Sequence, residues 1–199
     1  MTIIDYFGIL APIYDRVIKA GDSNKLMVLT GLPAQGRLLD AGGGTGRIAQ
    51  VVKGKITQVV VADLSIGMLR QAAAKNGLQT TCAQTEALPF PDGTFDRVTM
   101  VDAMHHVCDQ VSTALELWRV LKPGGRIVIE EPDIRFYVVK ITALIEKLVL
   151  MRSHFIPPSK IKALFGYPDA HSQIIQEGYT SWVIVDKLES TDTREHFPG

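Results

Sequence analysis

The sequence predicts an α/β fold with a doubly wound, mostly parallel sheet and helices on both faces. Short apolar runs such as Gln58–Ala62 (QVVVA) alternate along the chain with segments of helical apolar spacing such as Ser65–Lys75. The runs are continuous and β-branched, as in strands that are covered on both faces. Alternation of strands and helices implies right-handed crossovers between parallel strands.

The elements follow in a regular order from residue 37. The first strand, Arg37–Asp40, ends in a glycine cluster, and a helix begins after it at Arg47. The next helix stops at Asn76-Gly77, because glycine readily adopts the left-handed conformation that ends a helix. We expect strands at 37–40, 58–62, 78–83, 95–101 and 126–130, and helices at 47–53, 65–75 and 111–121, the last ended by residues 122–125 (KPGG).

Acidic residues stand at the ends of four of these strands. They are Asp40, Asp63, Asp102 and the pair Glu130-Glu131. Ligands of such sheets bind beyond the carboxyl ends of the strands. One acid alone would be explained equally well as a helix cap, but four together indicate a polar cleft at this edge.

Composition favours a single domain over residues 1–199. The 199 residues are 46% hydrophobic, and 21 basic side chains balance 21 acidic ones, which argues against a nucleic-acid-binding protein. Cys82 and Cys108 lack the spacing of a disulfide framework or a zinc site, so we expect reduced thiols and no metal. No signal-peptide pattern and no membrane-length apolar run stand out, which predicts a cytoplasmic protein.

The most informative segment is Leu38–Gly46 (LLDAGGGTG), where four of five consecutive residues are glycine. Glycine permits a tight strand-to-helix turn and the close approach of a ligand, and the next helix start offers N–H groups to an anion. A tight turn without a ligand is the alternative. Gly44–Ala49 also satisfies the dinucleotide pattern G-x-G-x-x-G/A, which alone is a weak signal.

Two acids restrict the ligand that this loop would take. The Asp40 carboxylate at the mouth of the loop would repel a pyrophosphate but suits an ammonium or sulfonium group. Asp63 comes 23 residues after Asp40. An acid about 20 residues after a glycine loop is placed to accept hydrogen bonds from ribose hydroxyls. Its alternative role is to cap the helix that begins near Ser65. Leu64 and Met68 are placed to form an apolar wall against a base, although Met68 is explained as well by the core.

Five motifs follow one another along the chain: LLDAGGGTGRIA (38–49), VVVADLSIGML (59–69), EALPFPDGTFDRV (86–98), VDAMHHV (101–107) and RVLKPGGRIVIEEP (119–132). With them the sequence resembles the class I S-adenosylmethionine-dependent methyltransferases, in particular the branch of the ubiquinone/menaquinone C-methyltransferases. The motifs cover about half of the chain. The resemblance implies a Rossmann-like fold, S-adenosyl-L-methionine as cofactor and in-line methyl transfer to a small-molecule acceptor.

The resemblance also implies a cofactor site by position. The loop from Asp40 to Gly46 would hold the methionine end, and Asp63 the ribose. Residues 85–86 would edge the adenine, residues 102–103 would lie near the sulfonium, and Tyr14 would close over the cofactor. The matching positions are Tyr14, Asp40, Ala41, Gly42, Gly44, Gly46, Asp63, Leu64, Met68, Thr85, Glu86, Asp102 and Ala103.

The chain departs from the family pattern in two places. The family usually has Gly-Asp before the adenine loop, where this chain has Ala83-Gln84, although Gln84 can still hydrogen-bond the adenine amino group. The family sheet ends in an antiparallel strand pair, of which Tyr179–Leu188 supplies one good strand. Residues 189–199 have little strand character, so we expect a short or incomplete antiparallel edge.

Candidate catalytic bases follow the fourth strand. His105 and His106 stand at the expected cleft edge, and a base is needed only if the nucleophile arrives protonated. Alternatively, one histidine caps the next helix and the other packs inside. His154 is a more remote candidate. Glu130 and Glu131 are placed to contact substrate but are explained more readily as structural carboxylates.

Residues 134–166 are expected to form a substrate-cap insertion. Residues 135–162 combine an apolar helical face with an excess of five basic side chains over acidic ones. This pattern fits a roof over the cleft or a homodimer contact, and less well a weak peripheral contact with an anionic membrane. The expected partners are a small-molecule substrate and, in one interpretation, a second copy of the chain, without nucleic acid or stable membrane insertion.

The leading hypothesis is therefore a small-molecule methyltransferase. One alternative is an NAD-dependent oxidoreductase, which only the Gly44–Ala49 pattern supports. Another is an S-adenosylmethionine-binding module without catalysis, which Gln84 and the weak C-terminal strand pattern leave open.

Overall fold

A seven-stranded sheet runs through the computed structural model, which describes residues 8, 11, 23–148 and 153–189. The strands are β1 (Arg37–Ala41), β2 (Gln58–Asp63), β3 (Gln79–Cys82), β4 (Phe95–Val101), β5 (Leu121–Pro132), β6 (Ala170–Glu177) and β7 (Thr180–Lys187). The helices are α2 (Ser23–Thr30), α3 (Arg47–Val52), α4 (Ile66–Ala73), the 3₁₀ turn η1 (Met104–His106), α5 (Gln110–Val120), α6 (Tyr137–Leu148) and α7 (Pro158–Ala163).

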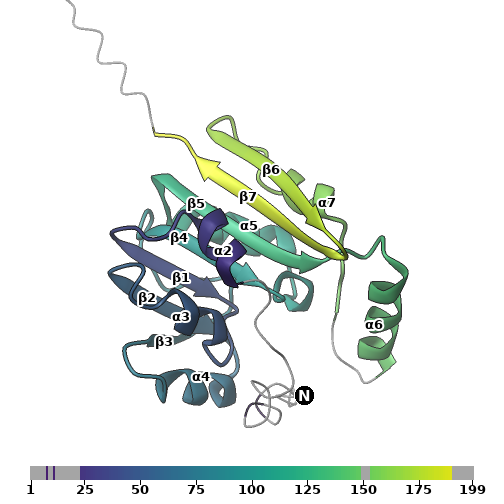
Figure 1. Cartoon of the computed structure of the whole chain (residues 1–199), viewed down its shortest axis with the longest axis horizontal. Coiled ribbons are helices and arrows are strands. Elements are labelled where there is room, and N and C mark those ends of the chain that lie inside the picture. The colour runs from purple at the N-terminus through teal and green to yellow at the C-terminus, as the bar shows by residue number, and fades with distance from the viewer. Residues whose placement is uncertain (1–7, 9–10, 12–22, 149–152, 190–199) are drawn as a thin grey trace, which may run out of the picture.

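The strand order is β3-β2-β1-β4-β5-β7-β6 (Figure 1). Strand β1 pairs in parallel with β2 on one side and with β4 on the other. The chain first builds the sheet outward from β1 to β3 and then returns to build it in the other direction from β4. The carboxyl end of β1 therefore lies at a topological switch point, where ligands of doubly wound sheets bind. The predicted fold class is confirmed.

The C-terminal edge is complete, and the expectation of a short or incomplete one was wrong. Strand β7 pairs antiparallel with β5 and with β6, and β6 and β7 each have eight residues. The partner of β7 precedes it in the chain, across a turn at Gly178-Tyr179. Most of β6 is exposed, because it is the edge strand, so its sequence (AHSQIIQE) lacks the apolar pattern by which strands are recognised.

Residues 121–125 also differ from the expectation. Helix α5 ends at Val120, and Leu121 already belongs to β5, where it pairs with Phe95. A register shift follows, and Arg97 then pairs with Arg126. The KPGG segment is thus an irregularity inside an extended strand. Glycine and proline are typical of such irregularities as well as of helix ends.

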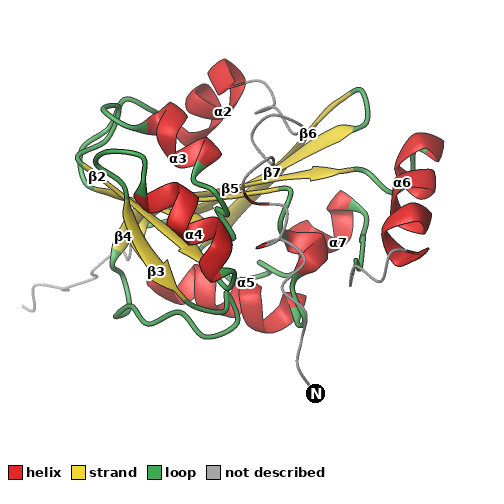
Figure 2. Cartoon of the chain, turned by 90° about the horizontal axis from the view of Figure 1, so that it is seen from below, coloured by secondary structure: helices red, strands yellow, loops and turns green. Residues whose placement is uncertain are grey.

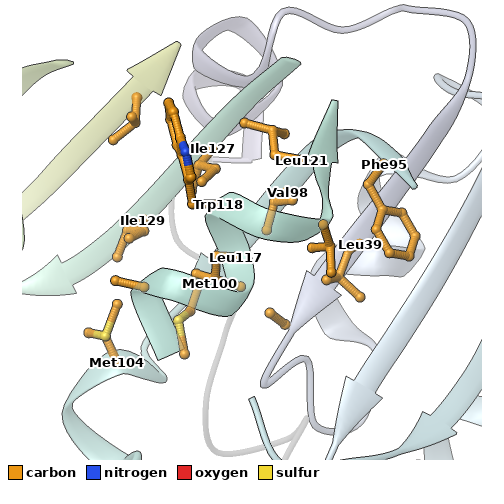
Figure 3. Packing of buried hydrophobic residues seen from close by; sticks show 14 of the residues in the cluster. Leu39, Phe95, Val98, Met100, Met104, Leu117, Trp118, Leu121, Ile127 and Ile129 are labelled. Carbon is orange, nitrogen blue, oxygen red and sulfur yellow. The ribbon is translucent and has the colours of Figure 1, made fainter. Parts of the chain in front are cut away.

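Helices cover both faces of the sheet (Figure 2). On one face α3 and α4 pack on β1 and β2, with α2 beside them. On the other face α5 and α7 close the largest core cluster, in which Met100 and Ile129 of the sheet meet Leu117 and Trp118 of α5 (Figure 3). Burial of these side chains holds the strand ends, and with them the loops of the site, in fixed positions.

The segment expected to be a cap divides into two parts. Helix α7 belongs to the body of the protein, since Ile161 is fully buried in the main core cluster. Helix α6 instead stands beyond the end of the β6–β7 hairpin (Figure 1) and exposes Tyr137, Ile141 and Leu144. No helix in the described ranges is long and apolar enough to cross a membrane.

Candidate functional site

The glycine loop between β1 and α3 occupies the carboxyl edge at the switch point. Gly42, Gly44 and Gly46 all have φ between 53° and 73°, a region that side chains disfavour. A Cβ on Gly42 would lie 2.7 Å from the Cβ of Ala103, which follows β4. The turn after β4 therefore packs directly against the loop, at a spacing that only glycine permits.

Asp40 stabilises this loop through hydrogen bonds to α3 and β4. Its side chain is buried, with Oδ2 accepting a hydrogen bond from the Ala49 amide (3.2 Å) and Oδ1 one from the Thr99 hydroxyl (3.1 Å). Burial raises the pKa of the Asp40 carboxyl to about 7. The side chain expected at the mouth of the loop is therefore buried beneath it, where its bonds to Ala49 and Thr99 fix the start of α3 to the sheet.

Asp63 connects the loop to the next strand end. Its Oδ2 accepts a hydrogen bond from the Gly44 amide (2.9 Å), and its Oδ1 accepts one from the Ser65 amide (2.7 Å). The N-cap of α4 is Ser65, whose hydroxyl accepts a hydrogen bond from the Met68 amide. The N-cap residue of α4 is therefore Ser65 and not Asp63, and Asp63 fixes Ser65 through the bond to its amide.

Three carboxyl groups gather where β4 and β5 end. The Asp102 carboxylate lies 3.4 Å from the Arg47 guanidinium, and its pKa is raised by burial and then by the charge of Glu131. Burial, followed by the charge of Asp102, raises the pKa of Glu130 to about 7. Each of these shifts means that the ionised form is disfavoured. A cation bound at this edge would relieve that cost, whereas a pyrophosphate would increase it.

His105 and His106 face different surroundings. The His105 ring is 4% exposed; its Nδ1 lies 2.5 Å from Oε2 of Glu131, and its ring stacks on Phe155 at 4.0 Å between centroids. The His106 ring is half-buried, with Nδ1 3.4 Å from the Ser153 hydroxyl. His154 is exposed, and it is the backbone N–H of His154 that reaches the His105 carbonyl oxygen.

The residues expected near the adenine lie in several parts of the structure and differ in exposure. Met68 is buried, and its sulfur lies 3.9 Å from the position of a Cβ on Gly44, whereas Leu64 is 58% exposed. Thr85 is buried against Thr113 of α5.

Glu86 accepts hydrogen bonds from the amides of Cys108 and Asp109, so it orders the segment between η1 and α5. Gln84 is exposed. Tyr14 lies outside the described residues.

A hollow of about 370 Å³ opens beside the segment between η1 and α5. It lies between the N-terminal end of α5 and α7 and contains none of the predicted cofactor residues. Its lining residues are Val107, Cys108, Asp109, Gln110, Val111, His154, Ile156, Lys160 and Leu164. Among the described residues no group of three or more His, Cys, Asp or Glu side chains is arranged to hold a metal ion.

Two side chains of the site were missed or undervalued. Arg47 was not among the predicted site residues, although a basic side chain at the start of a helix that follows an acidic strand end indicates an ion pair at the site. Glu131 was weighed as one of two equivalent carboxylates. Strand alternation separates the pair, because Glu130 and Glu131 point to opposite faces of β5, but only the structure shows which one meets His105.

Comparison with known proteins finds sequence similarity to methyltransferases. Residues 39–129 match the family model described as "Methyltransferase domain". A demethylmenaquinone methyltransferase of Thermus thermophilus is 36% identical over 139 residues, 63% of each chain. A ubiquinone/menaquinone biosynthesis C-methyltransferase of Marinomonas is 37% identical over 113 residues, 51% of this chain and 45% of the relative. The chain thus spans about half the length of the relatives that it matches.

Solved structures share the fold at low sequence identity. The methyltransferase in the complex with the Trm112 activator of Haloferax volcanii has a TM-score of 0.77 and 16% identity, covering 94% of this chain and all of that one. A geranyl diphosphate C-methyltransferase of Streptomyces coelicolor, solved with S-adenosyl-L-homocysteine, has a TM-score of 0.67 and 16% identity over 83% of this chain and 76% of that one.

Proposed function

Since residues 39–129 match the methyltransferase-domain family model, we propose that the chain is an S-adenosylmethionine-dependent methyltransferase with a small-molecule acceptor. The observation that carries the proposal is the glycine loop at the switch point, bonded to Asp63 at Gly44 and closed against Ala103. The single-domain organisation and the cytoplasmic location expected from the sequence remain part of this proposal.

The residues at the sheet edge fit the proposed cofactor. Asp40, Asp102 and Glu130 are carboxyl groups with raised pKa, and the sulfonium and ammonium groups of S-adenosylmethionine are cations of the kind that would stabilise them. Gly42 and Gly44 leave the backbone accessible beside them. In the proposal Asp63 accepts hydrogen bonds from the ribose, with Met68 next to the base. S-adenosylmethionine, when bound, supplies a methyl group that is already activated for displacement.

The chain's own contribution is then mainly positioning. Ala103 and Asp102 would form the wall beside the reacting centre, and the packing of the β4 turn on the glycine loop fixes the distance between the two sides. Holding two reactants in line can contribute on the order of 7–11 kcal/mol to a displacement. Burial of the His105 ring against Glu131 and Phe155 favours a structural role, so of the two proposed bases the half-buried His106 is the better candidate.

The acceptor is proposed only as a class. The relatives' names refer to ubiquinone/menaquinone biosynthesis and to demethylmenaquinone, so demethylated quinones belong in the first panel of acceptors to be tested. The exposed α6 helix is a candidate border of the acceptor site, in keeping with the proposed substrate cap, and a homodimer through α6 is the alternative use of the same face.

Titration calorimetry with S-adenosylmethionine and with NAD⁺ tests the cofactor directly. We expect S-adenosylmethionine to bind and NAD⁺ not to bind. Binding of NAD⁺ alone would overturn the proposal in favour of an oxidoreductase. Transfer of a radiolabelled methyl group from S-adenosylmethionine to any member of the acceptor panel would then exclude a binding module without catalysis.

A further inference from the structure

The turn that follows β4 has an unusual backbone. Asp102 has a φ of 52°, and it is the one non-glycine residue with positive φ in the part of the chain that the structure describes. Side chains disfavour this left-handed region, so a residue stays there only where its surroundings hold it. The Asp102 amide donates to the Glu130 carbonyl oxygen (3.0 Å), which fixes the residue from one side.

A single carboxylate holds the residues on the other side. Oε1 of Glu131 accepts hydrogen bonds from the amides of Ala103 (2.9 Å) and Met104 (2.7 Å). Oε2 lies 2.5 Å from the His105 ring. Glu131 is 4% exposed, so water does not compete for these contacts. Three consecutive residues of the turn are thus bonded to one buried side chain.

The position of this turn decides the shape of the proposed cofactor site. Ala103 lies so close to the glycine loop that a Cβ on Gly42 would overlap with it at 2.7 Å. Asp102 in turn places its carboxylate beside the Arg47 guanidinium at the start of α3. A shift of the turn by a few tenths of an ångström would therefore change both the width of the site and the direction of the Asp102 carboxylate.

We propose that Glu131 is a positioning residue, whose carboxylate holds the Ala103–His105 turn against the glycine loop and keeps Asp102 in its left-handed conformation. Glu131 itself does not contact the cofactor or the acceptor. The ligand part of this proposal rests on the proposed function, since it takes the loop and the turn as the two walls around the reacting centre. The geometric part stands on the hydrogen bonds alone.

Three variants separate positioning from general stability. Glu131→Ala removes all three contacts. Glu131→Gln keeps an oxygen that can accept both amide bonds, and Glu131→Asp keeps the charge but withdraws it by one methylene. Asp96→Ala is the matched control, because Asp96 likewise accepts a backbone amide bond, from Arg37 (2.7 Å), and pairs with a basic side chain, but at the opposite edge of the sheet.

We expect the dissociation constant for S-adenosylmethionine, measured by calorimetry, to rise about tenfold or more in Glu131→Ala and in Glu131→Asp, because the turn that forms one wall of the site is no longer held in position. Glu131→Gln should restore affinity to within about threefold of the unchanged protein, and Asp96→Ala should bind as tightly as it does. Thermal unfolding identifies any variant that is not folded, in which case the comparison of the Gln and Asp variants decides. Unchanged affinity in a folded Glu131→Asp variant would overturn the proposal.

Amide hydrogen exchange supplies a readout that needs no ligand. In Glu131→Ala the amides of Ala103 and Met104 should lose protection, while amides of the neighbouring strands keep theirs. Unchanged exchange at these two amides would refute the positioning role even if cofactor affinity fell. If the unchanged protein did not bind S-adenosylmethionine at all, the proposed function would fail, and the exchange result would still decide whether Glu131 holds the turn.

Discussion

Replacing the buried Asp40 by asparagine should make the protein more stable above neutral pH. Asparagine has the same shape; its amide oxygen can accept the Ala49 hydrogen bond, and its amide nitrogen can donate to the Thr99 hydroxyl. The variant therefore keeps the contacts of Asp40 and loses only its ionisation. Any pH-dependent difference between the two proteins reports the charge of this one carboxyl group.

The magnitude follows from the pKa of Asp40, which burial raises from 3.8 to about 7. A carboxyl group with a raised folded-state pKa binds its proton more tightly in the folded than in the unfolded protein. Its contribution to stability is therefore greatest at low pH, falls as pH rises from about 4 to about 7, and is constant above that range. At about 1.4 kcal/mol per pH unit, Asp40 should cost about 2–3 kcal/mol between pH 5 and pH 8.

The assay is urea unfolding of both proteins, followed by tryptophan fluorescence, at intervals between pH 5 and pH 8. We expect the stability of the Asp40→Asn variant relative to the unchanged protein to increase by about 2–3 kcal/mol between pH 5 and pH 8, with the two free energies of unfolding closest at the acidic end of this range. Using the difference between the two proteins cancels the contribution of Glu130, whose pKa is also raised to about 7. If the two stability curves ran parallel across this range, the reasoning from burial of Asp40 would be refuted.

Three further predictions concern the loop and α6. Asp63→Ala should weaken S-adenosylmethionine binding by about 1–3 kcal/mol, measured by calorimetry; an unchanged affinity would show that Asp63 serves only to order the loop. Gly42→Ala and Gly54→Ala both place a side chain at positive φ, which costs about 1 kcal/mol each. Only Gly42 meets a neighbour within 4 Å that leaves too little room, so its variant should lose clearly more stability in urea, and an equal loss would contradict the packing argument. Ile141→Ser on the exposed face of α6 should change stability by less than about 0.5 kcal/mol and leave cofactor affinity intact while altering acceptor preference in the methyl-transfer assay; unchanged kinetics with every acceptor would remove that face of α6 from the acceptor site.

The prediction from sequence succeeded where one local pattern carries the information. The loop from Leu38 to Gly46 shows its turn geometry in its glycines, and three of them do have positive φ. The strands β1, β2 and β4 lie within one residue of their expected positions, because each contains buried apolar residues that stand together in the sequence. Strand β6 failed the same test, since an exposed edge strand needs no such pattern.

The acids at the strand ends were predictable from the sequence, whereas the part played by Arg47 and the arrangement of these side chains were not. That acids end the strands follows from the chain order, and parallel strands bring those ends to one edge of the sheet. That Asp40 is buried under the loop, bonded to Thr99 59 positions away, depends on how β1 and β4 are aligned in the sheet. The pairing of His105 with Glu131 depends in the same way on the neighbouring strand β5.

The sequence by itself thus determined the order of the elements and the glycine-rich, acidic composition of the loop edge. It also indicated the kind of ligand that such an edge favours. These properties belong to residues that are close together in the chain. Only the tertiary structure decided which carboxylates are exposed to a ligand and which, like Glu131, are used inside the protein. Hydrogen bonds between distant segments depend on strand register and on the path of each turn, and neither is written in any single stretch of sequence.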